Sequence, residues 1–177
     1  MTFPYWIPFE NEWWMFASFL FLILGIVGIS DFTQKQDWIS PDANRKWVHF
    51  LVGIFVCISP LIFSTNLWPI TLSIIFIFLN GYALRKELFK GIHGQDRLSY
   101  GTVYFPIAYC IIVLVFWNYP ELIILSFLVL AISDPLAAQI GQSALFPSKF
   151  KIWVDEKTVQ GTFAFFSSAF IIIYLGA

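Results

Sequence analysis

Asp134 is the residue of this chain that most clearly suggests chemistry. It lies in the apolar run 121–141, which is long enough to form a membrane helix. A carboxylate inside a membrane costs roughly 3 kcal/mol or more, and such residues usually mark functional sites. Pro135 follows directly and predicts a bend or break in the helix. Three small residues come next: Ala137, Ala138 and Gly141.

A charge, a helix break and small side chains together predict a site where a polar ligand meets the backbone inside the membrane. The alternative is that the Asp134 carboxylate is buried against a Lys or Arg for structural reasons alone. We favour the functional interpretation, because an intramembrane carboxylate is a functional-site hypothesis by default.

A second polar group lies at 40–49. Residues 40–42 are suited to begin a helix, with a capping serine, a proline in the first position and an aspartate in the first turn. Arg45 and His49 then share one helix face, and Lys46 is adjacent. Two cations and an imidazole at a helix start predict a site for a phosphate or a lipid headgroup. The alternative is a basic anchor at the membrane boundary.

A third group lies at 155–162, at the start of the last apolar segment. A lysine, two hydroxyls and a glycine at a helix N-terminus are typical of a phosphate site. These residues are Lys157, Thr158, Gly161 and Thr162. The spacing differs from that of a Walker A loop, and a simple capped helix start is the alternative.

The composition indicates a membrane protein that crosses the bilayer several times. Of the 177 residues, 59% are hydrophobic and 12% are charged, whereas soluble domains have about 25% charged residues. The length predicts one domain, residues 1–177. The net charge of −1 gives no reason to expect a nucleic-acid partner. Cys57 and Cys110 lie in apolar segments, and we interpret them as small buried hydrophobes rather than a disulfide or a metal site.

The elements that must position these groups are six apolar helices. They lie at about 13–30, 47–63, 68–84, 102–117, 122–141 and 162–175. The predicted fold is therefore all-α, a polytopic transmembrane helical bundle of about six helices. Several segments are shorter than the usual twenty residues of a membrane helix.

The basic residues predict how the bundle is oriented. All ten lie in three loops, between the first and second, third and fourth, and fifth and sixth segments. The positive-inside rule then places these loops in the cytoplasm and both termini outside. Asp134 lies toward the same end of its segment, so we expect an integral membrane protein with its active site on the cytoplasmic side.

Four stretches, in this order, resemble the membrane kinase family of phytol kinase and dolichol kinase, which is related to the phosphatidate cytidylyltransferases. The first is matched by Arg45, Lys46, His49 and Gly53. The second is matched by Tyr100, Gly101, Tyr104, Phe105 and Pro106. The third is matched by Asp134, Ala137, Ala138 and Gly141. The last is matched by Lys157, Thr158, Gly161 and Thr162.

The resemblance implies phosphoryl transfer from CTP to a membrane lipid alcohol, such as phytol, a polyprenol or diacylglycerol. Asp134 would hold Mg²⁺, which keeps several waters and takes few protein carboxylates. Asp134, His49 and Lys157 are the candidate catalytic residues, with His49 or Asp134 as the base. The nucleotide and its phosphates would be held by Arg45, Lys46, Ala137, Ala138, Gly141, Lys157, Thr158, Gly161 and Thr162.

The chain departs from the family pattern at three positions. Ser133 replaces a glycine, Gln142 stands where a basic residue is common, and Gln160 replaces a glutamate that could serve as a metal ligand or base. The chain also ends one helix after the last motif, where relatives usually continue, so a minimal form, a fragment and an inactive relative are all open.

Other functions remain as alternatives. A phosphatidate cytidylyltransferase would use the same face and metal with a phosphate as acceptor. A lipid-binding relative without catalysis is favoured by Gln160. An ion-coupled carrier would need polar residues on several helices at mid-membrane, whereas here they gather at one face. A homo-oligomer is compatible with so thin a bundle.

Overall fold

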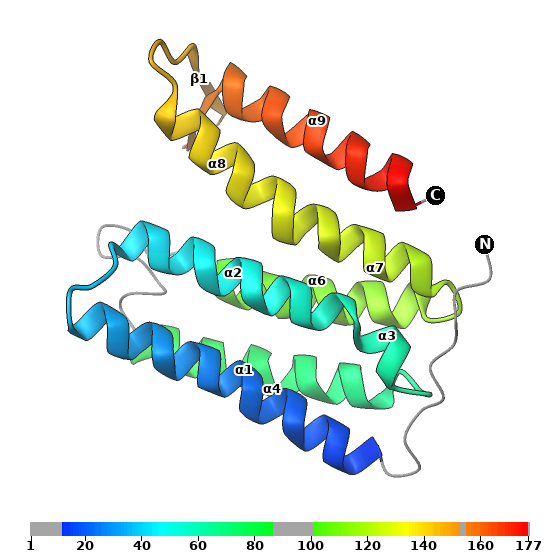
Figure 1. Ribbon diagram of the computed structural model, residues 1–177. Coiled ribbons are helices and arrows are strands. Elements are labelled where there is room, and N and C mark those ends of the chain that lie inside the picture. Colours follow the sequence, from blue (N-terminus) through cyan, green and yellow to red (C-terminus); the bar gives the residue numbers. More distant parts are fainter. Residues whose placement is uncertain (1–11, 87–100, 153–154, 177) are drawn as a thin grey trace.

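The computed structural model describes residues 12–86, 101–152 and 155–176, and all structural statements below concern these residues. Its helices and strands follow the chain in the order α1 (Glu12–Lys35), α2 (Pro41–Cys57), α3 (Ser59–Ile62), α4 (Leu67–Arg85), α6 (Gly101–Phe116), α7 (Pro120–Leu128), η1 (Val129–Ser133), α8 (Asp134–Ser143), β1 (Lys149–Ile152), β2 (Asp155–Thr158) and α9 (Val159–Gly176) (Figure 1).

The predicted all-α bundle is confirmed. Among the described helices, five segments are long and apolar enough to cross a membrane: Glu12–Lys35, Pro41–Ile62, Leu67–Arg85, Pro120–Ser143 and Val159–Gly176. The helix Gly101–Phe116 is apolar but has only 16 residues. Each of the six predicted apolar segments therefore corresponds to a helix or to a continuous run of helices.

A short β-hairpin was not expected from the sequence. Strands β1 and β2 pair antiparallel, with Lys149 opposite Thr158 and Ile152 opposite Asp155. The ammonium of Lys149 lies 3.2 Å from the Glu156 carboxylate. The hairpin connects α8 to α9 and ends where α9 begins, so it sets the position of the residues at the start of the last helix.

Five helices form a ring, and α9 lies outside it. Helix α1 packs against α2 and α4, α4 packs against α6, and α7 packs against both α2 and α6. Helix α9 contacts α8, η1 and α7, and Figure 1 shows it along the outer side of the α7–α8 run. The three largest fully buried side chains, Val113, Ile123 and Phe127, lie where α6 and α7 meet.

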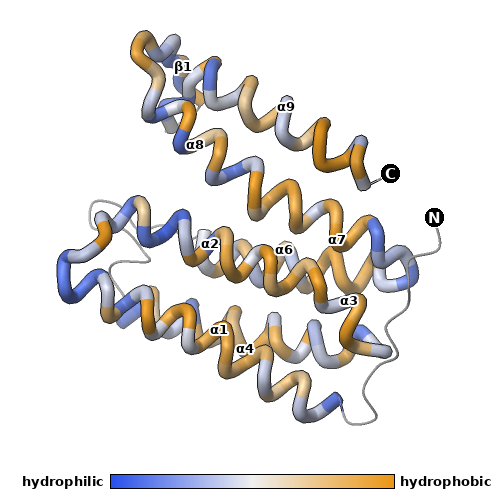
Figure 2. Tube along the Cα trace, in the orientation of Figure 1, coloured by the Kyte–Doolittle hydropathy of each residue, from blue (hydrophilic) through white to orange (hydrophobic). Residues whose placement is uncertain are grey.

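The outer surface of the bundle is apolar along most of its length. Figure 2 shows hydrophobic residues along the helices and hydrophilic residues gathered at their ends. Large apolar side chains are exposed on every long helix, for example Phe21, Phe78 and Phe166. A surface of this kind is stable in lipid rather than in water, which agrees with a membrane protein.

The ends of the bundle differ in charge. Helices α1 and α4 finish in Lys35 and Arg85. The hairpin, whose first strand begins at Lys149, lies at the same end of the bundle (Figure 1). The start of α1 and the end of α9 lie at the opposite end (Figure 1). This arrangement is the one that the basic loops predict, although Lys90 and Arg97 lie outside the described residues. The side of the membrane on which each end lies stays a prediction.

The predicted interruption at Asp134–Pro135 takes the form of a π-helical segment. Helix α7 passes through η1 into α8, and Asp134 is the first residue of α8. Proline has no N–H for the helical ladder, and a π segment is one way in which a helix absorbs such a defect. The run therefore continues without a break, and the interruption that the sequence predicts is confined to the π-helical turn.

Candidate functional site

The start of α2 is capped as predicted. The Ser40 hydroxyl accepts a hydrogen bond from the Ala43 N–H at 3.4 Å, and Pro41 occupies the first helical position. This fixes the first turn of α2 and, with it, the direction of the Asp42 side chain. Arg45, Lys46 and His49 follow on the next turns of the same helix.

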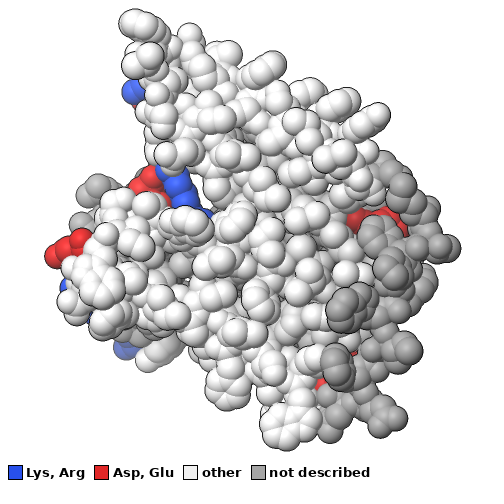
Figure 3. Space-filling view, in the orientation of Figure 1, with Lys and Arg blue, Asp and Glu red and all other residues white. Residues whose placement is uncertain are grey.

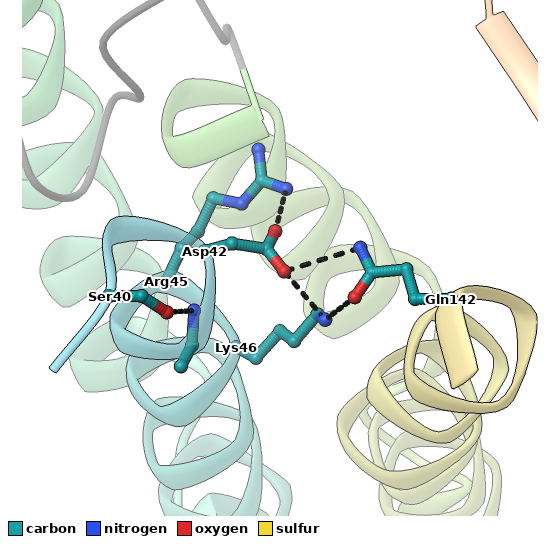
Figure 4. A network of polar contacts seen from close by, with 6 residues as sticks. Ser40, Asp42, Arg45, Lys46 and Gln142 are labelled. Carbon is teal, nitrogen blue, oxygen red and sulfur yellow. Dashed lines mark hydrogen bonds and ion pairs between the residues drawn. The ribbon is translucent and has the colours of Figure 1, made fainter.

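The cations of α2 are paired with a carboxylate of their own helix (Figure 4). Asp42 lies 3.2 Å from the Arg45 guanidinium and 2.7 Å from the Lys46 ammonium. Gln142 of α8 joins the same network, because its amide group donates to Asp42 at 3.3 Å while its carbonyl accepts from Lys46 at 2.6 Å. The network links the start of α2 to the end of α8.

Gln142 stands where the resembling family commonly has a basic residue. Its amide is suited to this position because it carries both a donor and an acceptor. A lysine or arginine there would satisfy Asp42 but would repel Lys46. Gln142 therefore lets α2 and α8 approach each other without bringing together like charges.

His49 is held by the backbone of η1. Its Nε2–H donates to the Leu130 carbonyl at 3.2 Å. A π-helical carbonyl normally accepts from the residue five positions on, and five positions after Leu130 stands Pro135, which has no N–H. The imidazole thus supplies the donor that the helix lacks. The ring also meets the edge of Phe105, with centroids 5.3 Å apart.

Asp134 lies beside His49 at the edge of the site. Its Oδ2 is 3.9 Å from His49 Nε2, and its side chain is 62% exposed. It is therefore an accessible carboxylate rather than one buried against a Lys or Arg, which was the alternative considered from the sequence.

A metal at this point would have Asp134 as its protein ligand. No group of three or more His, Cys, Asp or Glu side chains in the described part of the chain is arranged to hold a metal ion. Mg²⁺ commonly binds through one or two carboxylates together with substrate phosphates. The donor set thus fits a magnesium ion that arrives with a nucleotide, and it does not fit a metal held by the protein alone.

A cavity of about 540 Å³ runs inward from these residues. Its mouth is lined by Arg45, Lys46, His49, Asp134 and Ala138. Its walls come from α1, α2, α4 and α6 and are mostly apolar. The volume is in the range of small-molecule sites, which also combine apolar walls with a few polar groups. Figure 3, in the orientation of Figure 1, shows basic and acidic side chains in the indentation between the α8–α9 pair and the helices below it.

The inner end of the cavity is closed by one buried side chain from each wall helix. These are Ile23, Val56, Leu72 and Tyr109. The Tyr109 hydroxyl donates to Ser59 Oγ at 2.5 Å, so that its polar group is satisfied inside the bundle. The site thus has a charged mouth, an apolar interior and a closed floor.

At the predicted phosphate site, the start of α9, the polar groups form hydrogen bonds with one another. The Thr158 hydroxyl accepts from the Gly161 N–H at 3.1 Å, and the Thr162 hydroxyl donates to the Thr158 carbonyl at 3.0 Å. Lys157 is exposed on β2. The geometry is that of a capped helix start, the alternative considered from the sequence.

The small residues of α8 and α9 bring these two helices together. A Cβ placed on Gly161 would lie 2.7 Å from the Ala137 carbonyl, and one placed on Gly141 would lie 2.6 Å from Thr158 Oγ1. A Cβ on Gly53 of α2 would similarly meet Ala131 of η1 at 2.6 Å. Side chains have no room at these contacts, so the glycines permit close helix packing.

The structure thus divides the predicted site residues into two groups. Arg45, Lys46, His49, Asp134 and Ala138 come together at the mouth of the cavity. The second group lies on α8, on α9 or on the hairpin: Ala137, Gly141, Lys157, Thr158, Gly161 and Thr162. None of these six is among the described residues that line the cavity.

Gln160 has a structural task. Its amide donates to the Phe146 carbonyl at 2.9 Å, and its carbonyl accepts from the Ser148 N–H at 3.2 Å. These bonds hold the segment after α8 against the start of α9. A glutamate, which the resembling family has here, could accept from Ser148 but could not donate to Phe146.

Sequence reasoning gave two partners of the site no functional role. Asp42 was expected only as a first-turn acid, although its spacing of three and four residues from Arg45 and Lys46 is the signal for ion pairs on a helix. The Leu130 carbonyl carries no side-chain signal. It could have been found only by combining the proline at 135 with an expected π segment.

Comparisons with known proteins add a relationship but no activity. No protein-family profile and no solved structure matches the chain. The uncharacterized protein MJ1137 of Methanocaldococcus jannaschii is 33% identical in an alignment of 140 residues that covers 73% of this chain and 70% of that protein. This chain belongs to the family of MJ1137. The name of that relative states no function, so the function must be inferred from the site.

Proposed function

We propose that the protein transfers a phosphoryl group from CTP to a membrane lipid alcohol, assisted by Mg²⁺, at the cytoplasmic end of the bundle. The observation that carries this proposal is the continuity of the cavity, whose charged mouth opens directly into an apolar interior. A lipid alcohol has the same two parts, a hydroxyl and an apolar tail. The resemblance to the phytol kinase and dolichol kinase family supports the same reaction.

The reaction places few chemical demands on the protein. The oxygen of the alcohol attacks the γ-phosphorus, the bond from that phosphorus to the bridging oxygen breaks, and CDP leaves with the electron pair. Catalysis of such transfers depends on positioning and on charge stabilisation. Magnesium, when bound with the nucleotide, neutralises charge on the phosphates.

His49 and Asp134 are the groups that could take the proton of the alcohol. Because His49 Nε2–H donates to Leu130, its Nδ1 is the ring nitrogen left as a base. Asp134 is the alternative base, at the same mouth. If Asp134 holds the metal and His49 takes the proton, each residue performs one task.

Arg45 and Lys46 supply positive charge for the phosphates. Both are paired with Asp42 in the structure, and a triphosphate would compete with that carboxylate for them. Arg45 is exposed, so this competition would take place in a solvated region where ion pairs contribute little. Nucleotide contacts by Lys157, Thr158, Gly161 and Thr162 stay a prediction.

A second candidate is a lipid-binding protein without catalysis. It is favoured by the pairing of Arg45 and Lys46 with Asp42 and by the internal hydrogen bonds of Thr158, Gly161 and Thr162. Both observations mean that Arg45, Lys46 and the Gly161 N–H, which are expected to bind phosphate, already have partners.

Product analysis separates these functions. Purified protein in detergent with Mg²⁺ would be given CTP labelled in the γ-phosphate or in the α-phosphate, with phytol, a longer polyprenol, diacylglycerol or phosphatidate. Label from the γ-position in the lipid product is the expected result. Label from the α-position, with phosphatidate as acceptor, would instead identify a cytidylyltransferase.

Two controls complete this experiment. The same reactions with ATP test the choice of nucleotide. If neither label reaches any lipid while the folded protein still binds a lipid alcohol, the kinase proposal is wrong and the lipid-binding function replaces it.

A further inference from the structure

The cavity has exposed side chains along one of its walls. Leu24 of α1 is 39% exposed, and Leu79 and Tyr82 of α4 are 44% and 59% exposed, yet all three line the cavity. Gly28 of α1 is exposed and lines it as well. Residues that line a cavity and also face the surroundings mark a place where the cavity opens sideways.

We propose that the cavity opens to the bilayer between α1 and α4, and that a lipid tail passes through this opening while its hydroxyl reaches Asp134. The opening is defined by Leu24, Gly28, Leu79 and Tyr82. The choice of a lipid alcohol as occupant rests on the proposed function. The position of the opening rests only on the structure.

The depth of the opening suits a tail that remains in the membrane. Gly28 lies about two helical turns, roughly 10 Å, before Lys35 at the charged end of α1, and Tyr82 lies about one turn before Arg85. The hydrocarbon core of a bilayer is about 30 Å thick. The opening is therefore in the half of the bilayer that adjoins the charged end, where lipid tails are present and water is not.

The closed floor makes a lateral route necessary for long tails. The buried side chains of Ile23, Val56, Leu72 and Tyr109 end the cavity inside the bundle. From Lys46 at the mouth to Val56 at the floor, α2 advances about 15 Å. A tail longer than this cannot continue toward the other leaflet within the cavity, so it must leave between α1 and α4.

Two glycines of α1 allow a matched test. Among the described residues, nothing lies within 4 Å of a Cβ built on either Gly25 or Gly28, so both accept a larger side chain without a clash at that atom. Of the two, only Gly28 is among the described residues that line the cavity. Gly28→Phe would place a ring at the opening, whereas Gly25→Phe adds the same side chain one turn away.

The experiment measures the entry of an alcohol from lipid. The protein in phosphatidylcholine nanodiscs would be exposed to phytol that carries a photoactivatable diazirine in its tail, and covalent labelling would be quantified and mapped by mass spectrometry. We expect labelling of α1 and α4 near the opening. We expect Gly28→Phe to lower the labelling by about tenfold, the effect of losing the burial of about two methylene groups of the phytol tail. We expect Gly25→Phe to leave the labelling unchanged.

The outcomes separate this inference from the proposed reaction. Equal labelling of the two variants, or label mapped only to other helices, overturns the lateral opening, even if phosphate transfer is present. Labelling that depends on Gly28 without any phosphate transfer supports the opening and overturns the kinase. Thermal unfolding of both variants must match that of the unchanged protein, because a folding defect would lower labelling equally at either position.

Discussion

At the scale of single residues, the Leu130 carbonyl connects the π-helical segment η1 to His49 at the mouth of the cavity. Pro135 removes the N–H on which a π-helical turn would rely, and His49 donates to the carbonyl instead. This contact holds the imidazole next to Asp134, 3.9 Å away. One side chain therefore completes a helix and takes a place in the candidate site.

The two roles of His49 can be separated by substitution. His49→Ala leaves a half-buried carbonyl without its donor and is expected to lower the free energy of unfolding by about 1–3 kcal/mol. His49→Gln keeps a donor at this position and is expected to recover much of that loss. Thermal unfolding in detergent measures both, and equal unfolding temperatures for the two variants would contradict the assigned hydrogen bond.

Transfer assays on the same pair test the second role. If His49 also takes the proton of the alcohol, His49→Gln should regain stability but not phosphate transfer, because an amide is not a base at neutral pH. Recovery of both together would show that His49 only positions its neighbours.

At the scale of elements, the contact between α8 and α9 depends on the absence of side chains. A Cβ on Gly161 would lie 2.7 Å from the Ala137 carbonyl and 2.9 Å from Thr158 Oγ1. Backbone atoms cannot move aside as a flexible side chain can, so the helices would have to separate. The residues that resemble a nucleotide motif therefore also serve as a helix–helix contact.

Alanine substitutions at two glycines test this packing. Gly161→Ala is expected to lower the free energy of unfolding by about 1–3 kcal/mol, as overpacked contacts do. Gly81→Ala in α4 is the control, because no described residue lies within 4 Å of its Cβ, and it is expected to be neutral or to stabilise by up to about 1 kcal/mol. Equal unfolding temperatures for the two variants would show that the α8–α9 contact is looser than described.

The elements were largely predictable from the sequence, whereas their contacts were not. Long apolar runs predict membrane helices directly, and the cap of α2 follows from Ser40 and Pro41. The hairpin at 149–158 is short and rich in charge, and it carries no strong periodic signal. The bond from Lys46 to Gln142 joins residues that are far apart in the chain, and nothing in one sequence pairs them.

At the scale of the whole molecule, the basic helix ends and the polar mouth of the cavity lie at the same end of the bundle. The start of α1 and the end of α9 lie at one end of the bundle, and the polar mouth of the cavity lies near the other, beside the basic ends of α1 and α4 (Figure 1). The positive-inside rule would place this mouth in the cytoplasm, where nucleotides are present.

Fusion proteins in a bacterial host test this orientation. Alkaline phosphatase fused after Ala177 is expected to be active, because the enzyme folds only outside the cytoplasm, and green fluorescent protein at the same point is expected to be dark. Fusions after Lys86 are expected to show the reverse. An active phosphatase after Lys86 would place the candidate site on the outer side and remove its supply of CTP.

The most direct test of the central claim is phosphate transfer from γ-labelled CTP to phytol by the unchanged protein and by Asp134→Asn, with lipid binding measured in parallel. Asp134 is exposed at the mouth, so its replacement is expected to leave folding and phytol binding intact. We expect labelled phytyl phosphate from the unchanged protein and a loss of at least about a hundredfold in Asp134→Asn, as for removal of a group that stabilises charge in a transition state. Equal transfer by both proteins would contradict this expectation.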